Sequence, residues 1–217
     1  MSVKENYDKI KNVLKDKEVS LIAVIKGQSI EDIEELYKIG QRIFAENKVQ
    51  DLLSKIEYFK NTDMRWHFIG HLQRNKVKYI IDKVDLIHSL DNIKLAEEIS
   101  KRAISSGKIM DCLIQVNTGN EDNKYGIKFS ECEEFLDKVQ EFSGIRIVGL
   151  MAVTPFSENA ENARPYFKKM NLLFEKIKKE KYNNSEIKYL SMGMSNDYKI
   201  ATEEGANMVR IGSLLFY

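Results

Sequence analysis

The chain has 217 residues, of which 43% are hydrophobic, 31% are charged and only two are proline, a globular composition that excludes disordered and collagen-like chains. Its 34 Lys and Arg residues nearly balance its 33 Asp and Glu residues, which excludes a dedicated nucleic-acid-binding protein. No apolar run reaches membrane-spanning length, and the N-terminus lacks the apolar segment of a signal peptide. We therefore expect a cytoplasmic protein without nucleic-acid or membrane partners.

Residues 1–17 are helical in pattern, and short apolar runs then alternate with longer amphipathic stretches along the rest of the chain. The apolar runs predict strands at residues 19–25, 42–45, 66–69, 86–88, 110–116, 145–150, 189–191 and 208–211. Between them, apolar residues recur at spacings of three and four, as at Ile30, Ile33, Leu36 and Tyr37, which predicts helices.

Eight strand-helix units in this length leave about 27 residues for each unit, close to what a parallel βαβ repeat requires. The strict alternation predicts an α/β fold, a (β/α)₈ TIM-like barrel. No linker or shift in composition marks a boundary, so we expect one domain over residues 1–217. An open doubly wound sheet has the same alternation and is the alternative.

The common signatures of nucleotide, zinc and serine-hydrolase sites are missing from the sequence. Cys112 and Cys132 stand twenty residues apart, without a Cys-x-x-C motif or a histidine at metal-ligand spacing. We expect both thiols to be reduced and structural, and we expect no metal site.

In a parallel α/β fold, chemistry gathers where the strands end, at the C-terminal edge of the sheet. Lys26 follows one predicted strand directly. Burial there would lower its pKa and make its amine a nucleophile toward a carbonyl group. The alternative is a lysine whose amine merely extends out of the barrel mouth into water.

A second candidate site lies near the C-terminus. Ser195 precedes a helix-like stretch, and Gly212 and Ser213 offer backbone N–H groups after the last strand, a combination typical of a phosphate cradle. The alternative makes Ser195 an ordinary helix N-cap and Gly212 an ordinary turn. An amine nucleophile together with a phosphate cradle indicates a cofactor that is a phosphate-bearing aldehyde.

A series of motifs, in order along nearly the whole chain, resembles the YggS/PROSC family of pyridoxal phosphate homeostasis proteins. The most specific are WHFIGHLQRNK at residues 66–76 and SMGMSND at residues 191–197. The others lie at residues 21–26, 44–50, 115–117, 124–127, 149–151 and 209–212. The resemblance implies the fold-type III barrel that binds pyridoxal 5'-phosphate (PLP), similar to the N-terminal domain of alanine racemase.

The resemblance also implies roles for individual residues. Lys26 would be the Schiff-base lysine that holds PLP as an internal aldimine, and Arg210 would face the pyridine nitrogen. The remaining cofactor-binding residues would be Ser195, Gly212 and Ser213 at the phosphate, with Asn47 and Met151 lining the cofactor. His67 could contact the ring or be a buried, hydrogen-bonded histidine, and we favour the second.

The sequence departs from the usual family pattern around the expected cofactor. Residues 27–29, Ala45, Lys48 and His71 replace residues that are common in the family. These changes leave Lys26 and the phosphate cradle intact, but they alter the loop that would cover the cofactor.

A guanidinium at residue 210 could only donate to a neutral pyridine nitrogen, which disfavours the electron-sink chemistry of most PLP enzymes. The length also leaves no room for the second domain that supplies a catalytic tyrosine in racemase-like enzymes. We therefore expect a PLP carrier without catalytic residues, with apo PLP-dependent enzymes as partners, and the resemblance to a single-domain family implies a monomer. The alternatives are a small amino-acid racemase or lyase that uses Tyr125, His67 or Lys124 as a base, and a barrel that binds another phosphorylated metabolite.

Overall fold

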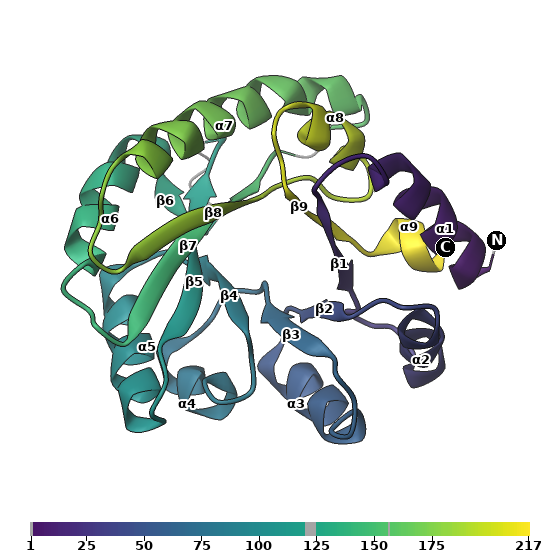
Figure 1. The fold of residues 1–217 in the computed structure, drawn as a ribbon, viewed down its shortest axis with the longest axis horizontal. Helices are drawn as coiled ribbons and strands as arrows, with labels where there is room; N and C mark the ends of the chain where they lie inside the picture. Colours follow the sequence, from purple (N-terminus) through teal and green to yellow (C-terminus); the bar gives the residue numbers. More distant parts are fainter. Residues whose placement is uncertain (1, 120–124, 156) are drawn as a thin grey trace.

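The eight predicted strands form a closed parallel barrel in the computed structural model, which describes residues 2–119, 125–155 and 157–217 (Figure 1). In order around the barrel they are β1 (Ser20–Val24), β2 (Ile43–Glu46), β3 (Arg65–Phe68), β4 (Leu86–Leu90), β5 (Met110–Asn117), β7 (Ile145–Val153), β8 (Ser185–Ser191) and β9 (Met208–Ile211). Pairing of β4 with β5 and of β9 with β1 closes the sheet, so the barrel prediction is confirmed and the open sheet is wrong. A two-residue strand, β6 (Ile127–Lys128), adds to β5 and was not predicted.

Helices surround the barrel and bury their apolar faces against it (Figure 1). They are α1 (Val3–Leu14), α2 (Ile30–Lys38), α3 (Val49–Tyr58), α4 (Val77–Ile80), α5 (Ile93–Ser105), α6 (Cys132–Val139), α7 (Arg164–Lys179), α8 (Tyr198–Glu203) and α9 (Ser213–Phe216). Short 3₁₀ turns, η1 (Arg74–Lys76), η2 (Phe129–Glu131) and η3 (Ala160–Ala163), precede three of them. Ser2 begins α1 in a capping box with Glu5, because its hydroxyl and the Glu5 carboxylate satisfy each other's backbone N–H groups.

The barrel interior contains a small apolar core that is separate from the larger core beneath the helices. Side chains along a strand alternate between the two faces of the sheet, so every second residue points inward. The buried inward residues of this core are Ile22, Ala45, Leu86, Leu113, Val148, Met151 and Met208. Buried polar residues lie two positions after three of these apolar residues, in the same strands. They are His88 after Leu86, Gln115 after Leu113 and Arg210 after Met208. The interior therefore changes from apolar to polar toward the C-terminal ends of the strands.

An irregularity in β7 places both Val148 and Met151 in this interior core. Cys112 and Leu113 of β5 pair with Ile147 and Gly149, so β7 has one extra residue there, and Val148 and Met151 both face the interior although they are three residues apart. Gly149 has a φ of +151°, and a Cβ atom built on it would lie 1.8 Å from the carbonyl oxygen of Tyr189. Only glycine allows β7 and β8 to pair this closely.

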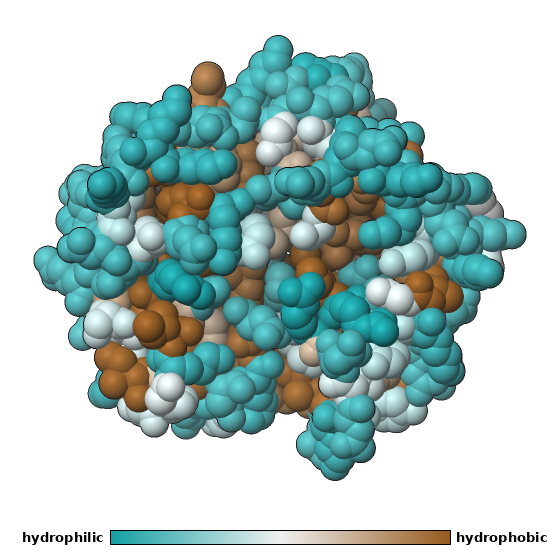
Figure 2. Space-filling view, in the orientation of Figure 1, coloured by the Kyte–Doolittle hydropathy of each residue, from teal (hydrophilic) through white to brown (hydrophobic). Residues whose placement is uncertain are grey.

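The surface in Figure 2 is mostly hydrophilic, with separate apolar patches between the charged side chains. Among the described residues, no helix is both long enough and apolar enough to cross a bilayer. Cys112 and Cys132 are buried and unpaired, and burial raises the pKa of the Cys132 thiol to about 12. Both thiols are therefore protonated, as the prediction of reduced, structural cysteines requires.

Substitution of Gly149 should weaken the fold because the new Cβ atom must displace the β8 backbone. We expect Gly149→Ala to lower the free energy of unfolding by about 2 kcal/mol or more, as measured by urea denaturation. Gly107→Ala is the matched control, because Gly107 also has a positive φ of +67° but a Cβ atom there meets open space. The explanation is wrong if the two variants unfold at the same urea concentration.

Candidate functional site

Lys26 lies in the turn directly after β1, at the C-terminal edge of the barrel. Its side chain is exposed, which agrees with the alternative of a lysine that extends out of the barrel mouth, because β1 ends at Val24 and only Ile25 continues into the core. Within the described parts of the chain, the Lys26 Nζ atom makes no hydrogen bond or ion pair. The amine is therefore available to a ligand at the barrel mouth.

A buried ion pair braces the backbone next to Lys26. Lys55 of α3 lies with its Nζ atom 2.5 Å from the Glu46 carboxylate and 2.6 Å from the Ile25 carbonyl oxygen, to which it donates. The other Glu46 oxygen accepts from the Asn47 backbone N–H at 2.7 Å. Lys55 thus contacts both Ile25, which follows β1, and Glu46, which ends β2. Because the Glu46 side chain is fully buried, these contacts fix the two strand ends relative to each other.

Ser195 and the turn after β9 come together at the same edge. The Ser195 hydroxyl oxygen accepts from the backbone N–H groups of Gly212 at 3.3 Å and Leu214 at 3.2 Å. Ser195 is not the N-cap of α8, since that position is occupied by Asp197. Leu214 was not identified from the sequence, because it contributes only its backbone and no side-chain signal marks it.

Arg210 is a buried cation in the polar part of the interior, 4% exposed. Its Nη1 group donates to the Ser191 carbonyl and hydroxyl oxygens at 2.9 and 2.8 Å, and its Nη2 group donates to the Ala152 carbonyl at 2.8 Å. Burial lowers its pKa to about 10, so it remains charged at neutral pH. Its Nε–H and second Nη2–H bind no acceptor in the described part of the chain, which leaves two donors for a ligand.

His67 is buried and hydrogen-bonded, which agrees with the second of the two roles expected for it. Its Nδ1 atom lies 3.0 Å from His88 Nε2, and His88 Nδ1 lies 3.2 Å from the Ser191 hydroxyl oxygen. Burial lowers the pKa of His67 to about 3, with a smaller contribution from Arg65, and burial likewise lowers that of His88 well below its ordinary value. Both imidazoles are therefore neutral at physiological pH.

The other predicted site residues lie on the same edge. Asn47 follows β2, and Gly70 packs so closely that a Cβ atom there would lie 2.0 Å from the Asn47 carbonyl oxygen. Met151 is buried in β7 beside Ser191 in the strand register. Ser213 is exposed as the first residue of α9, and its N–H is not one of the two that contact Ser195. The fold thus brings all seven predicted residues to one end of the barrel.

The residues that depart from the family pattern lie around this end. His71 stacks on the exposed Tyr125 ring with centroids 3.8 Å apart, and its Nδ1 atom lies 3.7 Å from the Asp91 carboxylate. Lys48 is exposed at the start of α3, whereas Ser29 caps α2. Lys124 lies outside the described residues.

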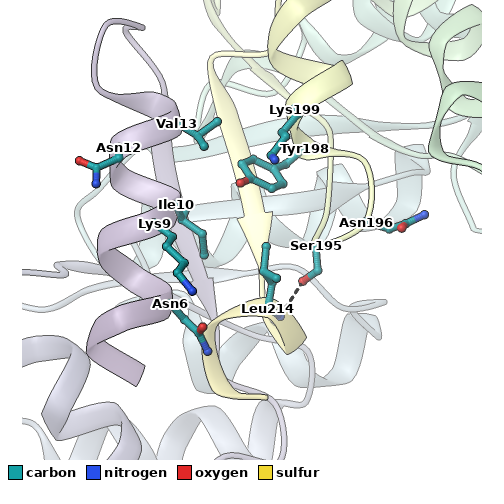
Figure 3. A pocket seen from close by; sticks show the side chains of 10 residues that line it. All are labelled: Asn6, Lys9, Ile10, Asn12, Val13, Ser195, Asn196, Tyr198, Lys199 and Leu214. Carbon is teal, nitrogen blue, oxygen red and sulfur yellow. Dashed lines mark hydrogen bonds between the residues drawn. The ribbon is translucent and has the colours of Figure 1, made fainter. Parts of the chain in front are cut away.

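A pocket of about 610 Å³ lies between α1 and the segments around α8 and α9 (Figure 3). Lys9 and Lys199 line it from α1 and α8, and Ser195 and Leu214 line it beside the barrel edge. In the close-up the Ser195 hydroxyl is directed at Leu214. The described residues contain no group of three His, Cys, Asp or Glu side chains that could hold a metal ion.

The whole sequence matches one known family, the alanine racemase N-terminal domain, over residues 1–217. The pyridoxal phosphate homeostasis protein of Aquifex aeolicus is 45% identical over 196 residues, which cover 90% of this chain and 85% of that protein. This chain belongs to the pyridoxal phosphate homeostasis protein family. The Escherichia coli member is 34% identical over 204 residues, covering 92% of this chain and 85% of that protein.

Solved structures of this family share the complete fold. PipY of Synechococcus elongatus superimposes with a TM-score of 0.92 without PLP and 0.90 with PLP bound, at 30% and 29% identity, and both chains are covered completely. Alanine racemase of Clostridium difficile has a TM-score of 0.75 at 16% identity, covering 99% of this chain but 56% of that one. That second likeness concerns the fold alone.

The two buried histidines should make the fold sensitive to acid. The unfolded chain takes up protons on them below about pH 6.5, whereas the folded protein resists protonation of His67 down to about pH 3. Their stabilisation is therefore complete above pH 6.5 and is lost as the pH falls below it. We expect the free energy of unfolding to fall by up to about 1.4 kcal/mol per pH unit for each histidine between pH 6 and 4.

Urea denaturation at a series of pH values measures this slope. His88→Gln should reduce it by about 1.4 kcal/mol per pH unit, because one histidine no longer titrates. Ser100→Ala, which removes a buried hydroxyl bonded to the Gly144 N–H, should lower stability equally at every pH. An unchanged slope in His88→Gln would contradict the assignment.

Removal of the cation from the Glu46–Lys55 pair should be costly because it leaves a buried carboxylate without its partner. We expect Lys55→Met to lower the free energy of unfolding by about 3–5 kcal/mol, and the double variant Glu46→Gln/Lys55→Met to recover most of that loss. Lys60→Met, which breaks the exposed pair with Glu57, should have little effect in the same urea experiment. Equal effects of Lys55→Met and Lys60→Met would show that the pair does not stabilise the strand ends.

Proposed function

We propose that this protein binds PLP through Lys26 and serves PLP homeostasis as a carrier and buffer of the cofactor. The proposal rests on three groups that lie together at one edge of the barrel. They are the exposed amine of Lys26, the turn in which Ser195 contacts backbone N–H groups, and the buried guanidinium of Arg210, which has two free donors. The family relationship supports it, since the curated relatives are pyridoxal phosphate homeostasis proteins and a PipY structure has PLP bound.

The residues present fit PLP by their chemistry. The free Nε–H and Nη2–H of buried Arg210 suit an acceptor such as a neutral pyridine nitrogen. Ser195, with the N–H groups of Gly212, Ser213 and Leu214, suits a phosphate. Bound PLP supplies an aldehyde that joins covalently to a primary amine, and Lys26 supplies that amine. In this proposal Asn47 and Met151 line the cofactor from β2 and β7.

The candidate bases for an enzyme suit catalysis poorly, which favours a carrier. His67 has a pKa near 3 and is engaged by His88, so it is a weak base at neutral pH. Tyr125 is exposed and stacked on His71. Arg210 would donate to the ring nitrogen of bound PLP and leave that nitrogen unprotonated, which would weaken the ring as an electron sink. The amino-acid racemase or lyase is therefore the second candidate.

We further propose that the protein acts as a monomer in the cytoplasm and delivers PLP to apo PLP-dependent enzymes, without nucleic-acid or membrane partners. The small, nearly balanced net charge of +1 supports a role that involves a small phosphate ester and other proteins.

Replacement of Lys26 should abolish covalent attachment. Protein incubated with PLP should show a visible absorption band, and borohydride reduction should add the pyridoxyl mass to the peptide that contains Lys26. Lys26→Ala should lose both signals, whereas Lys48→Ala, which removes an exposed lysine at the neighbouring strand end, should retain them.

Label on another lysine, or a band that persists in Lys26→Ala, would overturn the assignment. A protein that cannot be loaded with PLP would favour the third candidate, a barrel for another phosphorylated metabolite. Incubation of the loaded protein with amino acids separates carrier from enzyme, because a carrier gives turnover no faster than free PLP. Efficient turnover that Lys26→Ala abolishes would favour the racemase or lyase.

A further inference from the structure

Four buried side chains form one hydrogen-bonded chain across the barrel interior. Arg210 Nη1 donates to the Ser191 hydroxyl oxygen at 2.8 Å, that oxygen lies 3.2 Å from His88 Nδ1, and His88 Nε2 lies 3.0 Å from His67 Nδ1. The four residues come from β9, β8, β4 and β3, and none is more than 6% exposed. The chain thus joins the guanidinium at the proposed cofactor site to the opposite wall of the barrel.

The guanidinium determines the direction of every donor in this chain. Arginine only donates, so Ser191 accepts from it and must give its own hydroxyl proton elsewhere. In the described part of the protein, His88 Nδ1 is the acceptor within reach of that hydroxyl. His88 then carries its proton on Nε2 and donates it to His67 Nδ1, so His67 also carries its proton on Nε2.

Protonation of either imidazole would break this arrangement. A cationic His88 would donate from both nitrogens and could not accept the Ser191 proton, and a cationic His67 could not accept from His88. Both rings must therefore be neutral, which agrees with their burial and with the nearby charges on Arg65 and Arg210.

We propose that Ser191 and His88 are positioning residues that orient Arg210 toward the bound cofactor through a chain of neutral Nε2–H histidines. The inference rests on the proposed function. Ser191 and Ala152 receive three N–H groups of Arg210, and because the guanidinium is planar, these bonds fix where its Nε–H and remaining Nη2–H point. The other two acceptors are backbone carbonyls, whereas the Ser191 hydroxyl can rotate about its side-chain bonds. The hydrogen bond to His88 fixes the orientation of that hydroxyl.

The tautomers are tested in the cofactor-free protein by ¹⁵N NMR of the histidine side chains. Neutral Nε2–H forms of both His67 and His88 at pH 7 support the chain. A proton on Nδ1 of either ring, or a cationic ring, overturns it. This measurement does not depend on whether the protein binds PLP.

The positioning role is tested by titrating PLP into wild-type protein, Ser191→Ala, His88→Leu and His88→Gln, with visible absorption as the readout. Loss of a hydrogen bond to a charged group should weaken PLP binding about tenfold in Ser191→Ala and His88→Leu and shift the absorption band of the bound cofactor. His88→Gln, whose amide can accept from Ser191 and donate to His67, should bind PLP and absorb almost as wild type does. Ser100→Ala, which removes a buried hydroxyl of α5 that accepts from the Gly144 N–H, is the control for loss of stability alone.

Unchanged affinity and absorption in both Ser191→Ala and His88→Leu would overturn the positioning role while leaving the proposed function intact. Equal weakening in Ser100→Ala, or failure of His88→Gln to restore binding, would also overturn it, because either result indicates general destabilisation. Failure of the wild-type protein itself to bind PLP would instead overturn the proposed function.

Discussion

The closed parallel ladder is the constraint on which the rest of the structure depends. Because each pair of neighbouring strands is parallel and the β9–β1 and β4–β5 pairings close the ring, all eight barrel strands point the same way and their C-terminal ends share one rim. Side-chain alternation then sends every second residue into a narrow interior, where apolar residues such as Leu86 and Met208 are followed by the polar His88 and Arg210. The candidate site is the polar end of that interior together with the turns above it.

The buried guanidinium of Arg210 determines the chemistry of its surroundings. A cation in this position requires acceptors, and it receives them from one hydroxyl and two backbone carbonyls, with Asp197 as the carboxylate whose charge favours it. The neutral His67 and His88 avoid adding positive charge beside it, and their resistance to protonation in the folded state is the origin of the acid sensitivity. In the proposed function, stability and cofactor recognition thus depend on the same few residues.

Much of the fold could be predicted from the sequence because each barrel strand is a short apolar run. The β6 strand is too short to produce such a signal, and the shift at Gly149 depends on the approach of Tyr189 from another strand. The chain that joins His88 to Ser191 spans 103 residues of sequence and needs the strand register. For Lys26 the sequence left both a buried and an exposed side chain open, because the choice depends on where β1 ends and the turn begins.

The pairing of β1 with β9 also has a consequence for synthesis of the protein. Ser20 pairs with Met208, and Asn6 of α1 donates to the Leu215 carbonyl, so the fold joins elements that are far apart in the sequence. During translation, Lys26 leaves the ribosome long before Ser195, Arg210 and Gly212 exist. A chain that ends before β9 therefore exposes Lys26 without the turn that holds Ser195, and synthesis of β9 closes the barrel and completes the candidate site in one long-range folding step.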